Sequence, residues 1–133
     1  MARAVRRVVL DTNVLVAAAY NPDSASRQVV EACLNGELIE VLSSALRREY
    51  EFILARAVRG PSYRDRLQQL LEKAEVIIPE ETPRMVPDDP DDDKLVAAAL
   101  VASAFLVTND AHLLAVAGHE GLRAIRPVDL RAR

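Results

Sequence analysis

The chain begins with a short apolar run that ends in an acid and is followed by a second apolar run. The aliphatic run 8–10 (VVL) is typical of a strand buried on both faces, as strands of parallel sheets are. Asp11 therefore lies at the carboxyl end of the first predicted strand, where open α/β sheets place their chemistry. A helix is expected to begin near Val14, with Thr12 or Asn13 able to cap it. The competing interpretation is that Asp11 only helps to cap this helix.

Strand and helix patterns alternate along the rest of the chain. A connector rich in proline and acids extends from Pro79 to Pro90 and is too short to divide the chain into domains. Alternating strands and helices without internal repeats predict a single α/β domain over residues 1–133, with a mainly parallel sheet. Further strands are expected at about 38–42, 74–78, 105–108 and 123–125, and helices at about 14–20, 25–34, 44–58, 63–73, 91–103 and 111–117.

The composition, 50% hydrophobic and 28% charged residues, is that of a globular protein. No apolar run reaches the roughly 18 residues that span a bilayer, and Asp11 interrupts the apolar run that a signal peptide would need. We therefore expect a cytoplasmic protein with no membrane partner. The single cysteine, Cys33, cannot form an internal disulfide and has no thiolate partners for zinc, so a buried helical position is expected.

A second acid follows another predicted strand. The segment FLVTND ends in Asp110, just beyond the strand expected at 105–108. Because the carboxyl ends of parallel strands lie at one edge of the sheet, Asp11 and Asp110 can converge although they are far apart in the sequence.

A run of acids precedes the helix that leads to this strand. The segment PDDPDDDK carries five acids between Asp88 and Asp93. Acids at a helix start complement the helix dipole by a few tenths to about 1 kcal/mol each, and one or two are enough for this purpose. The excess indicates that at least one of Asp91, Asp92 and Asp93 belongs to a metal site. The pattern alone leaves open which of them it is.

The helix after the second predicted strand carries two candidate acids, Glu49 and Glu51. Apolar positions such as Leu46, Tyr50 and Leu54 define its buried stripe. Glu49 borders this stripe, whereas Glu51 is directed farther away, so Glu49 is the preferred candidate. The alternative is that Glu49 is an ordinary solvated acid of the helix surface.

Four carboxylates in one cleft require a cation. Two unit charges about 5 Å apart repel by roughly 3 kcal/mol at an effective dielectric constant near 20. With oxygen ligands and no His or Cys among the candidates, Mg²⁺ or Mn²⁺ is the fitting ion. A calcium loop of the EF-hand type starting at Asp89 is excluded, because Lys94 stands at its glycine position and Leu100 at its closing acid. Two bound Mg²⁺ ions would change the formal charge from −3 to +1, so the acidic balance does not exclude a polyanionic substrate.

These acids stand in segments that resemble the PIN-domain ribonucleases, the family that includes the VapC-type toxins of bacterial and archaeal toxin–antitoxin pairs. The resemblance is spread in order over nearly the whole chain. It is carried by the segments VVLDTNVLVAA, SSALRREYEFIL and DPDDDKLVAAALVASAFLVTNDAHLL.

The resemblance implies a Rossmann-like α/β/α sandwich around a parallel sheet of about five strands, often in a homodimer. It implies that the family's four acids fall on Asp11, Glu49, Asp93 and Asp110, with Asp92 as the substitute for Asp93. Supporting polar positions are implied at Asn13, Ser43 and Thr108. The implied activity is hydrolysis of single-stranded RNA with one or two Mg²⁺ or Mn²⁺ ions, leaving 5′-phosphate and 3′-hydroxyl ends, and the implied protein partner is a cognate antitoxin that inserts an Arg into the acidic cleft.

Two other classes of protein fit parts of the pattern. A phosphoaspartyl hydrolase or a receiver domain also places an Asp at a strand end. The hydrolase needs a second Asp where this chain has Asn13, and the receiver needs a Lys at a late strand end, whereas Lys94 lies at a helix start. A non-catalytic PIN-like module that binds RNA or protein is the remaining alternative, and it has no need for four mutually repelling acids.

Overall fold

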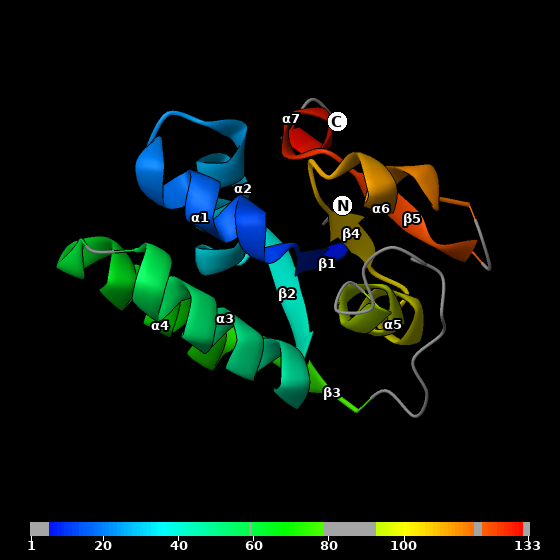
Figure 1. Cartoon of the computed structure of the whole chain (residues 1–133), viewed down its shortest axis with the longest axis horizontal. Coiled ribbons are helices and arrows are strands. Elements are labelled where there is room, and N and C mark those ends of the chain that lie inside the picture. The colour runs from blue at the N-terminus through cyan, green and yellow to red at the C-terminus, as the bar shows by residue number, and fades with distance from the viewer. Residues whose placement is uncertain (1–5, 59, 79–92, 119–120, 132–133) are drawn as a thin grey trace, which may run out of the picture.

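The computed structural model describes residues 6–58, 60–78, 93–118 and 121–131; for Asp93 and Arg131 it describes only their place in a helix (Figure 1). The described residues form a five-stranded parallel sheet in the order β3-β2-β1-β4-β5. The strands are β1 (Arg6–Leu10), β2 (Leu38–Ser43), β3 (Glu75–Ile77), β4 (Phe105–Val107) and β5 (Arg123–Ile125). The predicted fold class, including the parallel sheet of about five strands, is confirmed.

Strand β1 lies at the centre of the sheet. Val8 is paired with Glu40 of β2 on one side and with Phe105 of β4 on the other. The chain runs from β1 outward to β2 and β3, and then returns past β1 to β4 and β5. In open α/β sheets such a reversal of strand order opens a crevice at the carboxyl ends of the strands, here between β1 and β4.

Helices cover both faces of the sheet, which explains why Val8, Val9 and Leu10 are fully buried. Helices α1 and α2 lie on one side and α5 packs against β1 and β2 from the other (Figure 1). Helix α3 contacts both α1 and α5. The helices are α1 (Thr12–Tyr20), α2 (Ala25–Leu34), α3 (Ser44–Ala57), α4 (Pro61–Lys73), α5 (Asp93–Ala102), α6 (Ala111–Ala115) and α7 (Pro127–Arg131).

Helix α1 begins two residues earlier than the sequence pattern predicts. The helix starts at Thr12, and Asp11, not Thr12 or Asn13, caps it by accepting from the Asn13 backbone N–H. Asp11 can do so because its backbone is extended, with φ −60° and ψ 139°, which places its carboxylate over the first turn. The expected helix start near Val14 is therefore wrong.

The short helix α7 was not predicted. It spans only five residues, too few for an apolar period to be recognised. Pro127 begins it, a residue suited to the first helical position, and Leu130 is buried with 1% of its surface exposed. Helix α7 packs against α2 and closes that side of the core. Cys33 is buried in α2, as predicted.

Candidate active site

Asp11 is a buried acid at the carboxyl end of the central strand. Only 5% of its surface is exposed, and its backbone N–H continues the ladder by donating to the Val107 carbonyl at 3.0 Å. Its carboxylate accepts from the Asn13 N–H at Oδ1 (3.2 Å) and from the Thr108 hydroxyl at Oδ2 (2.7 Å). The side chain is thus held by groups from both strand ends that border the crevice.

Thr108 connects Asp11 to the segment that carries Asp110. Its hydroxyl donates to Asp11 and accepts from the Asp110 backbone N–H at 2.9 Å, and the residue has no exposed surface. Asp110 caps α6 by accepting from the His112 N–H at 2.7 Å, while 30% of its side chain remains exposed. One hydroxyl therefore fixes the relative positions of two sequence-predicted acids.

Glu49 lies on α3, which is attached to the same strand end through the neighbouring Tyr50. The buried Tyr50 hydroxyl donates to the carbonyl of Leu10, the residue before Asp11. Burial raises the pKa of Tyr50 well above its usual value, and the charges of Glu40, Asp11 and Glu49 raise it further. The structure therefore brings Asp11 and Glu49 within electrostatic reach of one buried hydroxyl.

The two acids of α3 have different surroundings, as the helical spacing predicts. Glu49 is half-buried beside the apolar stripe. Glu51 is exposed and forms an ion pair with Arg47 at 3.2 Å, one turn away on the helix surface.

Ser43 and Asn13 each take part in a hydrogen bond at the start of a helix. Ser43 is 4% exposed and caps α3 by accepting from the Leu46 N–H at 3.2 Å. Asn13 supports Asp11 through its backbone N–H, and its side chain is exposed. The Asn13 side chain is accessible to solvent, whereas the Ser43 hydroxyl is buried.

The acidic run is described only at its end. Asp93 is the first described residue of α5, whereas Asp91 and Asp92 lie outside the described residues, as does the side chain of Asp93. The following residue, Lys94, lines a cleft together with Glu49. The start of α5 is thus opposite the helix that carries Glu49, although the choice between Asp92 and Asp93 stays a prediction.

A hard divalent cation fits the donor chemistry of this edge, because Asp11, Glu49 and Asp110 offer only carboxylate oxygens. The Asp11 carboxylate is oriented by the two donors described above, the Asn13 N–H and the Thr108 hydroxyl. Among residues whose side chains are described, no three His, Cys, Asp or Glu lie close enough together to hold an ion. That an acid of the run ending at Asp93 completes the ligand set stays a prediction.

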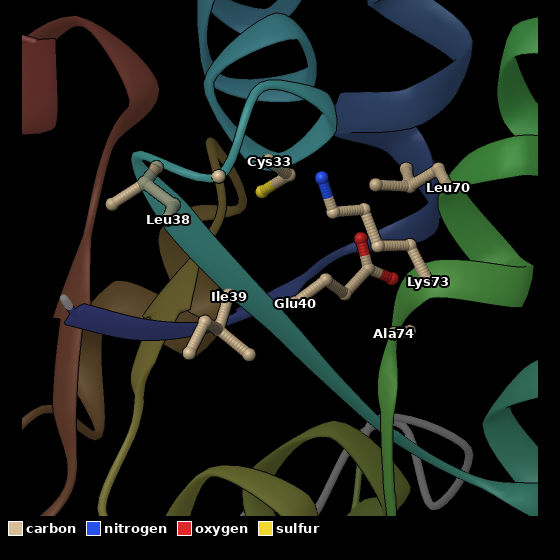
Figure 2. A pocket seen from close by; sticks show the side chains of 8 residues that line it. Cys33, Leu38, Ile39, Glu40, Leu70, Lys73 and Ala74 are labelled. Atoms are coloured by element: carbon tan, nitrogen blue, oxygen red, sulfur yellow. The ribbon is translucent and has the colours of Figure 1, made fainter.

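Besides Asp11, the sheet contains another buried acid that sequence reasoning missed. It is Glu40, in the middle of β2. It is 2% exposed, and neither carboxylate oxygen has a hydrogen-bond partner among the residues that the structure describes. Figure 2 shows its side chain in a pocket of about 60 Å³ beside Cys33 and Lys73. The Lys73 ammonium donates to the Leu34 carbonyl at 2.8 Å instead. Burial raises the pKa of Glu40 from 4.5 to about 8, so this carboxyl is mostly neutral at pH 7.

Comparisons with known proteins agree with this architecture. The sequence profile of the PIN domain matches residues 7–112. The fold is similar to that of VapBC2 from Rickettsia felis, a structure bound to a DNA fragment from their promoter, with a TM-score of 0.60, 15% identity and coverage of 90% of this chain and 98% of that one. It is also similar to DNA-bound VapBC from Salmonella typhimurium, with a TM-score of 0.62, 14% identity and coverage of 92% and 99%.

A third similar structure is PAE2754 from Pyrobaculum aerophilum, with a TM-score of 0.60, 21% identity and coverage of 97% of this chain and 91% of that one. A search of curated proteins found no significant match. The chain belongs to the PIN-domain family, whose members are generally nucleases. No helix among the described residues is long and apolar enough to cross a membrane.

Proposed function

We propose that this chain is a metal-dependent endoribonuclease that hydrolyses phosphodiester bonds of single-stranded RNA and leaves 5′-phosphate and 3′-hydroxyl ends. The observation that supports this proposal most directly is the arrangement of Asp11, Thr108 and Asp110 at the crevice between β1 and β4. Membership of the PIN-domain family supports nuclease chemistry. The proposed acids are Asp11, Glu49, Asp93 and Asp110, with Asp92 as the alternative to Asp93.

In this proposal the acids hold one or two Mg²⁺ or Mn²⁺ ions, which supply a water of lowered pKa and a positive charge opposite the phosphate. The protein's own contribution is orientation. Thr108 and the Asn13 N–H keep the Asp11 carboxylate in one position, while Tyr50 holds α3 and therefore Glu49 against the end of β1. Such preorganisation matters because a misplaced ligand weakens both ion binding and catalysis.

The direct test is cleavage of a panel of labelled RNAs with Mg²⁺ or Mn²⁺, with and without EDTA. We expect metal-dependent cutting that disappears in Asp11→Asn, while the far-ultraviolet circular dichroism stays unchanged. Asp65→Asn is the matched control, because Asp65 is an exposed acid on α4. Cutting by highly purified Asp11→Asn at the wild-type rate would refute the assignment.

We also propose that the chain acts in the cytoplasm as a homodimer and is the toxin of a toxin–antitoxin pair. The similarity to VapBC from Rickettsia felis and from Salmonella typhimurium supports a cognate antitoxin. Co-purification of this chain with the product of an adjacent gene, followed by loss of RNA cleavage in the complex, would support this role. Light scattering of the isolated chain measures whether it is a dimer.

A non-catalytic binding module is the second candidate, and specific contacts favour it. Asp11, Ser43 and Asp110 each cap a helix, so each has a structural role that needs no metal. Calorimetric titration with Mn²⁺ separates the two functions. The nuclease predicts uptake that is lost in Asp11→Asn, and the binding module predicts no uptake by the folded wild-type chain.

A further inference from the structure

A cleft of about 470 Å³ adjoins the candidate site along α3. It is larger than the pockets beside Glu40, between α3 and α4, and beside α2, which measure about 60, 210 and 190 Å³. Five of its lining residues form one face of α3, at positions three or four residues apart, and Lys94 of α5 lies across from them. The α3 residues are Ala45, Arg48, Glu49, Phe52 and Ile53.

The cleft contains an aromatic ring that is unusually accessible for its size. Phe52 is 57% exposed although it lies on the helix that carries the buried Tyr50. The Arg56 guanidinium stacks over the ring, 3.6 Å from its centre, and donates to the Phe52 carbonyl at 3.1 Å. Arg56 therefore supports one side of the ring, while the ring also lines the cleft. A supported, exposed ring of this kind is a platform on which a flat group can stack.

The charges around this platform favour a polyanion. Among the residues that the structure describes, the charged residues lining the cleft are Arg48, Lys94 and Glu49. By contrast, the pocket beside α2 is lined by Glu31 and Glu37 as well as Arg27. Glu49 itself belongs to the proposed metal site, where a divalent cation would more than balance its charge. Phe52 follows Glu49 by three residues, which places their Cβ atoms roughly 5–6 Å apart on the helix surface.

From this placement we infer that the cleft binds the single-stranded RNA next to the cleaved bond, with one base stacked on Phe52 and the adjoining phosphates held by Arg48 and Lys94. The inference rests on the proposed nuclease function and assigns it a base-binding subsite. Stacking on an aromatic side chain tolerates any base, so Phe52 supplies affinity with little sequence preference. Arg48 and Lys94 supply a salt-dependent contribution, because phosphate contacts release counterions.

The test uses fluorescence anisotropy in the Asp11→Asn background, which keeps the RNA intact. The probes are a labelled mixed-sequence RNA of about 10 nucleotides and a ribose-phosphate strand of equal length without bases. We expect Phe52→Ala to weaken RNA binding about 10- to 100-fold and to change binding of the base-free strand less than about twofold. Phe52→Trp should restore binding, and Phe52→Leu should not.

The cations are tested by the salt dependence of the same binding. Arg48→Gln and Lys94→Gln should each reduce the slope of log affinity against log salt by about 0.7, and Phe52→Ala should leave the slope unchanged. Tyr20→Ala and Arg64→Gln are matched controls, because Tyr20 is 71% exposed, Arg64 is exposed, and neither lines the cleft.

Equal weakening of both strands by Phe52→Ala would overturn the subsite, and so would the absence of RNA binding. A change from dimer to monomer with unchanged RNA affinity would show that this face joins two copies of the chain, which also overturns it. Cleavage by the wild-type chain is measured separately. If one of these results is found while the wild-type chain still cleaves RNA in a metal-dependent way, only this inference is refuted. Cleavage of the RNA probe by Asp11→Asn would refute the proposed function.

Discussion

Asp11 and Glu40 are two buried acids of the central part of the sheet with opposite surroundings. Asp11 follows the last residue of β1, where the free N–H groups of α1 and the hydroxyl of Thr108 reach its carboxylate. Glu40 lies inside β2, where no group of the described part of the chain forms a hydrogen bond with its carboxyl. The difference follows from position. Within a sheet the backbone donors are used by neighbouring strands, whereas a strand end faces helix starts whose donors are still available.

The different surroundings of Asp11 and Glu40 suit the two acids to different roles. An acid held by hydrogen-bond donors is oriented, as a metal ligand must be. An acid without donors is held neutral by burial, as the pKa of about 8 for Glu40 indicates. This contrast favours the end of β1 over the middle of β2 as the place of the proposed metal site.

The largest expected effect is on stability and comes from Glu40. Because its pKa is raised from 4.5 to about 8, the folded chain binds a proton that the unfolded chain releases, and stability is lost as pH rises through this window. The free energy of unfolding should fall by up to about 5 kcal/mol between pH of about 4.5 and 8 and then level off. Urea titrations at several pH values measure this fall.

Glu40→Gln should remove most of this pH dependence and leave RNA cleavage unchanged. Glu72→Gln is the control, because Glu72 is an exposed acid on α4. An equally steep loss of stability in Glu40→Gln would show that another group causes it, and the contrast between the two acids would then be wrong.

The next effect concerns the hydroxyl that orients Asp11. Thr108→Val keeps the shape of the side chain but removes the donor to Asp11 and the acceptor for the Asp110 N–H. We expect the rate of RNA cleavage, and the affinity for Mn²⁺, to fall about 10- to 100-fold, as for other groups that orient metal ligands. Thr108→Ser should retain most of the activity. Wild-type activity in Thr108→Val would show that orientation of Asp11 by this hydroxyl is not needed for cleavage.

A smaller effect is expected from the tyrosine that attaches α3 to β1. Tyr50→Phe removes a buried donor to the Leu10 carbonyl and should cost about 1–2 kcal/mol in the free energy of unfolding. Tyr63→Phe is the matched control, because Tyr63 makes the equivalent bond to the Leu15 carbonyl at 3.1 Å, farther from the site. If Tyr50 positions Glu49, only Tyr50→Phe should also lower the affinity for Mn²⁺, as measured by calorimetry.

The smallest effect is expected from Glu51, a surface acid with which the buried acids can be compared. Glu51 pairs with Arg47 on the helix surface, with 49% of the Glu51 side chain and 34% of the Arg47 side chain exposed. Glu51→Gln should change the free energy of unfolding by less than about 0.5 kcal/mol and leave cleavage at the wild-type rate. A large loss of cleavage in this variant, with full activity in Glu49→Gln, would transfer the proposed catalytic role from Glu49 to Glu51.

The sequence alone was sufficient for the parallel α/β fold, for the strand end at Asp11 and for the contrast between Glu49 and Glu51, because these depend on local patterns. Contiguous aliphatic residues indicate a buried strand, and helical spacing separates a half-buried position from an exposed one. The short α7 and the start of α1 were missed, since one has too few residues for a period and the other depends on which side chain reaches the first turn.

Only the tertiary structure decided which groups surround each acid. No local pattern distinguishes Glu40, in the strand segment LIEVLS, from an acid on the wet face of a strand, and none pairs Thr108 with Asp11 across 97 positions of the sequence. These relations arise when β1 pairs with β4 and when helices cover both faces of β2. Local spacing fixes which elements form, whereas hydrogen-bond partners and burial are set by strand order and register, which join residues far apart in the chain.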